Sequence, residues 1–125
     1  MRRGMWTVTD SRQKGKRGEL EVAQLFRAIN IKACRSQQFS GKGLGPGDVI
    51  LHDLNGHPLP TFVEVKRREV YSSNQLLAWV EQASQEAGSG NVGLVIHRKS
   101  KQPWQVTFLL SDMDYLLEDL RQLWE

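Results

Sequence analysis

The sequence has few of the residues on which several protein classes depend. It contains one cysteine, Cys34, so neither an intrachain disulfide nor a cysteine-based zinc site can form within one chain. It has no apolar run long enough to span a membrane, and its basic N-terminus lacks the apolar segment of a signal peptide. Its three histidines show no H-x-x-H or H-E-x-x-H pairing, which argues against a histidine metal site. We therefore expect a protein of a reducing, cytoplasmic compartment without membrane contact.

The charge is unevenly distributed along a chain of ordinary composition. The 125 residues, 39% hydrophobic and 25% charged, are enough for one domain with a substantial core. Basic residues crowd the N-terminal end and acidic residues the C-terminal end, around a net charge of +3. We expect residues 1–11 to form an irregular basic leader and residues 12–125 a single domain. Such a leader can contact phosphates, and a solvated tail is an equal alternative.

Hydrophobic periodicity predicts alternating helices and strands. Apolar residues at helical spacing predict helices over residues 12–29 and 75–87 and a last helix after Ser111. Apolar or alternating runs predict strands over residues 31–37, 48–54, 61–67, 92–96 and 104–110. The order α-β-β-β-α-β-β-α predicts an α/β (α+β) fold with a mixed central β-sheet flanked by helices.

Two of the predicted strands contain charged residues among apolar ones. Glu64 and Lys66 lie two positions apart, so they share one face of their strand. Asp48 begins the preceding strand, and Asn55-Gly56 between the two strands is a strong hairpin signal. Within about one residue of register, such a hairpin brings Asp48 level with Glu64. The three charged side chains can therefore meet.

Two carboxylates beside a lysine suit the hydrolysis of a phosphodiester. Mg²⁺ favours one or two carboxylates together with a substrate phosphate, and it stabilises the charge that develops on the scissile phosphate. Lys66 could orient or help deprotonate the attacking water. An isolated E-x-K pattern is more often a solvated strand with a weak ion pair. The addition of Asp48 at a compatible spacing favours a functional site over that alternative.

Gly47-Asp48 together with Glu64-Val65-Lys66 resembles the signature of the PD-(D/E)XK nuclease superfamily. The segments 16–21 and Cys34-Arg35-Ser36 resemble its Holliday junction resolvase branch, which has archaeal and phage types. The similarity runs from about residue 14 to residue 110 and includes the order of the elements. It implies a restriction-endonuclease-like core.

The resemblance also implies roles for individual residues. Asp48 and Glu64 would bind Mg²⁺, for which Mn²⁺ can substitute, with the backbone carbonyl of Val65 as an additional ligand. Lys66 would be the catalytic lysine. Glu19, on the helix before the first strand, would be a further acidic contributor. No small-molecule cofactor is implied.

Three positions near the expected site leave questions open. Helical geometry alone does not choose between Glu19 and Glu21, because they lie at opposite borders of the apolar stripe. Pro46 stands one residue before the position of the superfamily's proline. Leu20 stands where archaeal-type resolvases often have an arginine, so another arginine would have to supply that phosphate contact.

We expect a metal-dependent, structure-selective endodeoxyribonuclease, and a Holliday junction resolvase before other kinds. A four-way junction has two-fold symmetry, which predicts a homodimer with two sites. The alternatives are a nicking or restriction-type nuclease on duplex, flap or single-stranded DNA, a nuclease on RNA, and a non-catalytic DNA-binding module. Candidate phosphate contacts, each of which could equally be a solvated charge, are Arg17, Arg35, Lys42, Arg67, Arg68, Arg98, Lys99 and Lys101.

Overall fold

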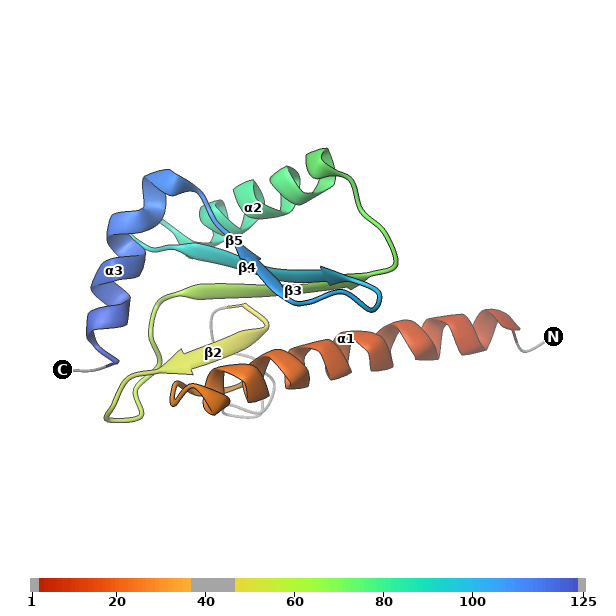
Figure 1. Ribbon diagram of the computed structural model, residues 1–125, viewed down its shortest axis with the longest axis horizontal. Coiled ribbons are helices and arrows are strands. Elements are labelled where there is room, and N and C mark those ends of the chain that lie inside the picture. Colours follow the sequence, from red (N-terminus) through yellow and green to blue (C-terminus); the bar gives the residue numbers. More distant parts are fainter. Residues whose placement is uncertain (1–2, 37–46, 124–125) are drawn as a thin grey trace.

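The computed structural model describes residues 3–36 and 47–123, and the side chains from residue 15 onward. The predicted order of elements is confirmed (Figure 1). A 3₁₀ turn, η1 (Leu110–Asp112), precedes the last helix. The helices and strands are α1 (Arg3–Ala28), β1 (Lys32–Arg35), β2 (Val49–His52), β3 (Phe62–Arg68), α2 (Ser73–Ala87), β4 (Gly93–Lys99), β5 (Gln105–Thr107) and α3 (Met113–Arg121).

The strands form a mixed three-stranded sheet and an antiparallel pair. The sheet has the order β3-β4-β5, in which β3 and β4 are parallel and β4 and β5 antiparallel. The strands β1 and β2 form the antiparallel pair. Helix α2 makes the crossover between the parallel strands, and α1 and α2 lie on opposite sides of the sheet (Figure 1). This α+β arrangement is consistent with the predicted restriction-endonuclease-like fold.

The expected irregular leader over residues 1–11 is wrong for residues 3–11. Helix α1 begins at Arg3 rather than at residue 12. Residues 3–17 contain no proline, and their Arg, Lys and Gln residues have high helix propensity, so the helix extends through them despite Gly4 and Gly15. The basic segment is therefore continuous with the helix that bears Glu19.

The expected hairpin between residues 48–54 and 61–67 is only partly correct. The chain does turn at Asn55-Gly56, with Gly56 at φ +84° and an N–H···O bond of 3.0 Å to Asp53. The returning segment meets β2 through a bridge between His52 and Pro58, and β2 has β1 as its ladder partner. Prolines 58 and 60 lack the N–H that a longer ladder needs, which explains the early separation.

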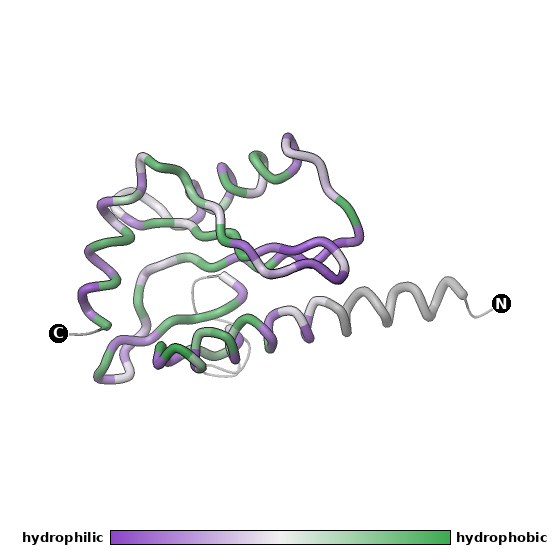
Figure 2. Tube along the Cα trace, viewed as in Figure 1, coloured by the Kyte–Doolittle hydropathy of each residue, from purple (hydrophilic) through white to green (hydrophobic). Residues whose placement is uncertain are grey.

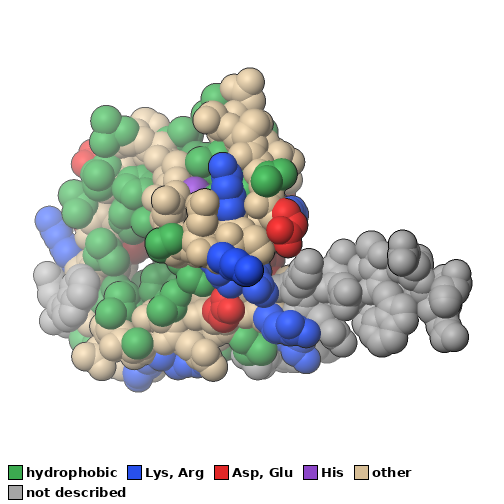
Figure 3. Space-filling model, turned by 45° about the vertical axis from the view of Figure 1, so that its right-hand side comes forward, with side chains coloured by type: hydrophobic (Ala, Val, Ile, Leu, Met, Phe, Trp, Pro, Cys, Tyr) green, Lys and Arg blue, Asp and Glu red, His purple; other side chains and the backbone are tan. Residues whose placement is uncertain are grey.

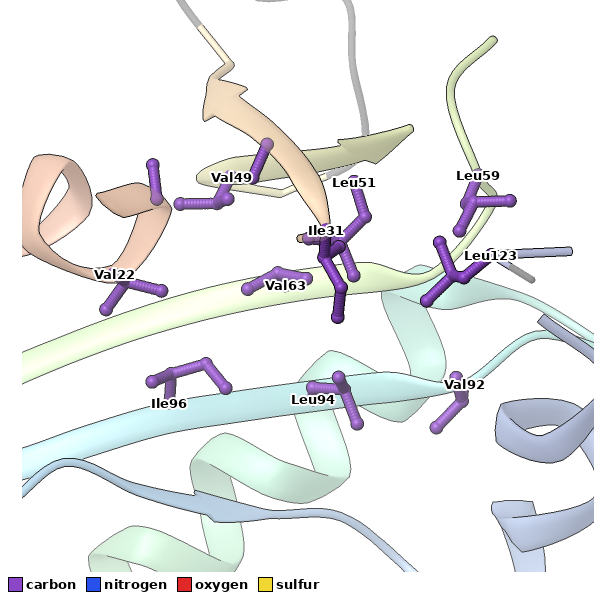
Figure 4. Close-up of a cluster of buried hydrophobic side chains, with 12 residues drawn as sticks. Val22, Ile31, Val49, Leu51, Leu59, Val63, Val92, Leu94, Ile96 and Leu123 are labelled. Carbon is purple, nitrogen blue, oxygen red and sulfur yellow. The ribbon is translucent and has the colours of Figure 1, made fainter. Parts of the chain in front are cut away.

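Two hydrophobic clusters lie on the two sides of β3. The larger one fills the space between α1, β2, β3 and β4 and includes the fully buried Val22, Val49 and Val63 (Figure 4). The smaller one lies under α2 and consists of Val80, Ala83 and Val95. Because side chains alternate along a strand, Glu64 and Lys66 face the side of α2 while Val63 and Val65 face the larger cluster.

Helix α2 approaches the main chain of β4 closely at Gly93. A Cβ atom placed on Gly93 would lie 2.3 Å from the carbonyl oxygen of Ala83. At the start of the helix, Ser72 Oγ accepts a hydrogen bond of 3.1 Å from the N–H of Gln75. These contacts fix the height and the beginning of α2 above the sheet.

Strands β3 and β4 change from hydrophobic to hydrophilic along their length (Figure 2). Because they are parallel and in register, their polar ends lie side by side, with Lys66 opposite His97 and Arg68 opposite Lys99. None of the helices in the described part of the chain is long and apolar enough to cross a membrane.

Candidate active site

Asp48 stands at the entrance to β2 and is held against β3. Its N–H donates a 2.7 Å bond to the carbonyl of Val63, and its Oδ2 accepts a 2.9 Å bond from the N–H of Val65. The preceding Gly47 has φ +73°, and a Cβ there would lie 2.3 Å from the Val63 carbonyl oxygen. Only glycine fits this close approach. Asp48 therefore lies beside the E-x-K strand as predicted, but through a parallel bridge between Gly47 and Val63 rather than through a hairpin ladder.

Glu64 and Lys66 lie beside each other on the α2 face of β3. The distance between Lys66 Nζ and Glu64 Oε1 is 3.5 Å. Burial, followed by the nearby charge of Asp48, raises the pKa of Glu64 to about 7, even though Lys66 opposes that shift. Half-buried acids that interact this strongly are typical of functional sites.

Helix α1 contributes a third acid, Glu19. Arg35 of β1 donates a 2.9 Å bond from Nε to Glu19 Oε1, and both side chains are largely buried. Burial raises the pKa of Glu19, the bond from Arg35 lowers it, and the charge of Asp48 raises it further. Glu21 instead faces Arg98, with 3.4 Å between Oε2 and Nη2. The structure thus places Glu19 rather than Glu21 near Asp48.

A family model described as "Phage putative PDDEXK endonuclease" matches residues 10–123. The chain belongs to this PDDEXK endonuclease family. The sequence resemblance to the PD-(D/E)XK superfamily is thereby confirmed, and the match does not bear on the Holliday junction resolvase branch. Comparisons with curated proteins and with solved structures give no match.

The donor set of this PDDEXK endonuclease fits a divalent cation. Asp48 and Glu64 provide two carboxylates, and Mg²⁺ needs no more when waters and a substrate phosphate complete its shell. The bond from Val65 leaves Asp48 with acceptor capacity, since a carboxylate has about four lone-pair sites. Among the described residues, no three His, Cys, Asp or Glu side chains are placed to hold a metal together. Glu19 lies close enough to Asp48 that, in addition to burial, the charge of Asp48 raises its pKa.

Two of the predicted phosphate contacts are engaged by acids. Arg35 is bound to Glu19, as described above. Arg98 faces Glu21, and its guanidinium lies 5.1 Å from the centre of the Trp104 ring. These two arginines support the fold around the site in addition to any role toward DNA.

The other predicted contacts are spread over the chain. Arg17 is exposed on α1. Arg67 lies on the α1 side of β3. A Cβ placed on Gly18 of α1 would lie 3.6 Å from the Cβ of Arg67. Lys42 lies outside the described residues. Lys and Arg side chains run down the middle of the face shown in Figure 3, with Asp and Glu side chains among them.

Sequence reasoning missed an aromatic pair beside Lys66. The ring centre of Trp79 lies 5.5 Å from Lys66 Nζ, and the Tyr71 ring lies 5.1 Å from that of Trp79. Trp79 and Leu76 lie at helical spacing within the predicted helix over residues 75–87, and that spacing does not reveal which side chains Trp79 contacts. One signal could have found the pair. The predicted helix over residues 75–87 follows the strand with the E-x-K pattern and packs back over it, so a tryptophan on that helix can reach Lys66.

Proposed function

We propose that the chain is a divalent-metal-dependent endodeoxyribonuclease that cuts branched DNA, four-way junctions before other structures, as a homodimer. The observation that supports it most directly is the meeting of Asp48 and Glu64 beside Lys66, with the pKa of Glu64 raised to about 7. A purely structural strand would not need this arrangement, because partly burying two carboxylates close together is costly.

In this proposal each residue has a separate task. Asp48 and Glu64, with the carbonyl of Val65, hold Mg²⁺ or Mn²⁺. When bound, the cation stabilises the charge on the phosphate and the leaving oxygen and lowers the pKa of water. The ammonium of Lys66, 3.5 Å from Glu64, orients the attacking water against the phosphorus. Glu19, held by Arg35, accepts a hydrogen bond from solvent at the edge of the site.

The choice of substrate rests on the sequence and on symmetry. Residues 16–21 and Cys34-Arg35-Ser36 resemble junction resolvases, and this resemblance favours four-way junctions over linear DNA. Two symmetric cuts in a two-fold substrate require two active sites, which a homodimer supplies.

A panel of substrates tests the proposal. The chain is incubated with a synthetic four-way junction, a flap, a linear duplex, a single strand and an RNA duplex, in Mg²⁺, in Mn²⁺ and in EDTA. We expect paired cuts in the junction that need a divalent metal and that Asp48→Ala and Glu64→Ala abolish, while junction binding in a gel-shift assay survives. The mass in solution should be that of a dimer.

Three results would change this assignment. Equal cleavage of the linear duplex would remove the junction selectivity. Preferred cleavage of RNA would change the substrate class. Full cleavage by the Asp48→Ala and Glu64→Ala variants would overturn the metal site itself.

A further inference from the structure

Three cationic side chains lie on one face of the two parallel strands. Lys66 and Arg68 are two positions apart on β3, and Lys99 on β4 is the register partner of Arg68. Register partners in a sheet point to the same side, so all three face α2. They occupy the hydrophilic ends of the strands seen in Figure 2, next to the carboxylates of the site.

Two aromatic rings support these cations. The Trp79 ring centre lies 5.5 Å from Lys66 Nζ and 5.7 Å from the guanidinium carbon of Arg68. Tyr71 lies with its ring centre 5.3 Å from Lys99 Nζ, and the two rings are 5.1 Å apart. A ring face attracts a cation but does not neutralise it, so the positive charge remains available to an anion.

The ring pair is anchored inside the protein. The Tyr71 hydroxyl forms a 2.6 Å hydrogen bond with Nδ1 of His97, whose side chain is buried. On its other side, His97 Nε2 is 2.8 Å from the Thr107 hydroxyl of β5. This series of side-chain hydrogen bonds, from Thr107 of β5 through His97 to Tyr71, holds the Tyr71 ring in one orientation. The cations therefore rest on a rigid support.

The charge environment of these cations differs from that of the arginines on the other side of the sheet. Arg35 and Arg98 each pair with a glutamate. In residues 15–36 and 47–123, by contrast, no carboxylate lies within ion-pair distance of Arg68 or Lys99. Like charges directly opposite each other in a sheet are destabilising, and an anion bound between them would remove that cost.

We propose that Arg68 and Lys99, on the support formed by Trp79 and Tyr71, bind the phosphates of the DNA strand next to the scissile phosphate. Arg68 lies two residues beyond Lys66, which is about 6.6 Å along a strand, and in the direction away from the carboxylates. The position relative to the scissile phosphate rests on the proposed function. The binding of DNA phosphates by the two cations does not.

The salt dependence of DNA binding tests this site without any cleavage. Binding of a fluorescent four-way junction and of a linear duplex is measured in EDTA over a series of KCl concentrations. Each lost phosphate contact lowers the slope of log K against log salt by about 1. We expect Arg68→Gln/Lys99→Gln to lower the slope by between about 1 and 2 and to weaken binding roughly tenfold or more in 0.1 M KCl.

Matched variants separate this site from a general effect of charge. Arg68→Lys/Lys99→Arg keeps both charges and should keep the slope. Arg121→Gln removes one exposed cation from α3, where Arg121 lies 3.5 Å from Glu118, and should also leave the slope unchanged. The two single variants, with thermal melting as a folding check, replace the double variant if it does not fold.

The outcomes are independent of nuclease activity. An unchanged slope in Arg68→Gln/Lys99→Gln, an equal loss in Arg121→Gln, or no binding by the unmodified chain each overturns the site. A lowered slope in a chain that cuts none of the substrates would retain the site and refute only the proposed function.

Discussion

The N–H of Val65 donates a 2.9 Å hydrogen bond to Oδ2 of Asp48. The middle residue of Glu64-Val65-Lys66 thus holds the carboxylate of Asp48, which precedes β2, beside the two charged residues of β3. Its side chain packs against the larger hydrophobic cluster, while its neighbours face the opposite side. One residue therefore joins the core to the site through its side chain and its main chain.

Gly47→Ala should damage both stability and cleavage. The φ of +73° costs about 1–3 kcal/mol for a residue with a side chain, and the new Cβ would also meet the Val63 carbonyl. Asp48 would then move away from Val65. Urea unfolding and junction cleavage measure the two effects.

Gly56→Ala is the matched control for that substitution. Gly56 has φ +84°, but no atom lies within 4 Å of a Cβ built there, and the residue is in the turn after β2. Gly56→Ala should lose only the part of the stability that comes from its φ, with cleavage intact. If Gly47→Ala cleaves as well as Gly56→Ala, the close approach at Val63 does not position Asp48.

The raised pKa of Glu64 predicts how pH affects stability and metal binding. The pKa moves from the ordinary 4.5 to about 7, so the folded state holds this proton more tightly than the unfolded state. The contribution of Glu64 to metal-free stability is therefore full below about pH 4.5 and is lost as pH rises through about 7. A divalent cation competes with the proton, so its affinity should rise between pH 5.5 and 7.5.

Thermal melting with and without Mg²⁺ at pH 5.5, 6.5 and 7.5 measures this linkage. The increase in Tm caused by Mg²⁺ should grow with pH in the unmodified chain. In Glu64→Gln, which has no proton to exchange, the pH dependence should be much smaller. A Mg²⁺ effect that is the same at all three pH values would contradict the assignment of Glu64.

The pair formed by Glu19 and Arg35 should couple in a double-mutant cycle. Arg35→Leu leaves a largely buried carboxylate without its donor, which should cost about 1–3 kcal/mol. Glu19→Gln/Arg35→Leu should recover part of that loss, because no charge then remains unpaired. Urea unfolding gives the coupling energy. The longer, more exposed pair of Glu21 and Arg98 should couple by less than about 1 kcal/mol. A larger coupling energy for Glu21 and Arg98 than for Glu19 and Arg35 would contradict the geometry.

Replacing Lys66 should affect the chemical step more than binding. Lys66→Gln removes the ammonium beside Glu64 but leaves both carboxylates, and we expect single-turnover cleavage to fall by about 10²–10⁴. The affinity for a junction in EDTA should fall by no more than is expected for the loss of one phosphate contact. A loss of binding as large as the loss of cleavage would assign Lys66 to the DNA surface rather than to the reaction.

Short-range patterns in the sequence were enough to predict much of the site. Alternation along β3 placed Glu64 and Lys66 on one face, and the turn at Asn55-Gly56 correctly indicated that the chain reverses before β3. The apolar run over residues 92–96 correctly predicted a buried strand, because only a central strand buries both faces.

Relationships between distant segments could not be predicted in the same way. The predicted helix over residues 12–29 includes Ile29, yet α1 ends at Ala28 and Ile29 is 63% exposed. The rotation of α1 against the strands decides between Glu19 and Glu21, and it depends on what packs against the helix. The support of Lys66 by Trp79 depends on the register of β3 with β4 and on the height of α2, and neither is encoded in a local pattern.

The main-chain contact between Gly93 and Ala83 has a consequence for which substitutions this fold can tolerate. The separation of α2 from β4 is set there by atoms that every amino acid shares. Replacements among the apolar side chains under α2 therefore act on a helix whose approach to the start of β4 is already limited by main-chain atoms. Any side chain at position 93 would push α2 away from the sheet, and with it the Trp79 ring that lies over Lys66 and Arg68.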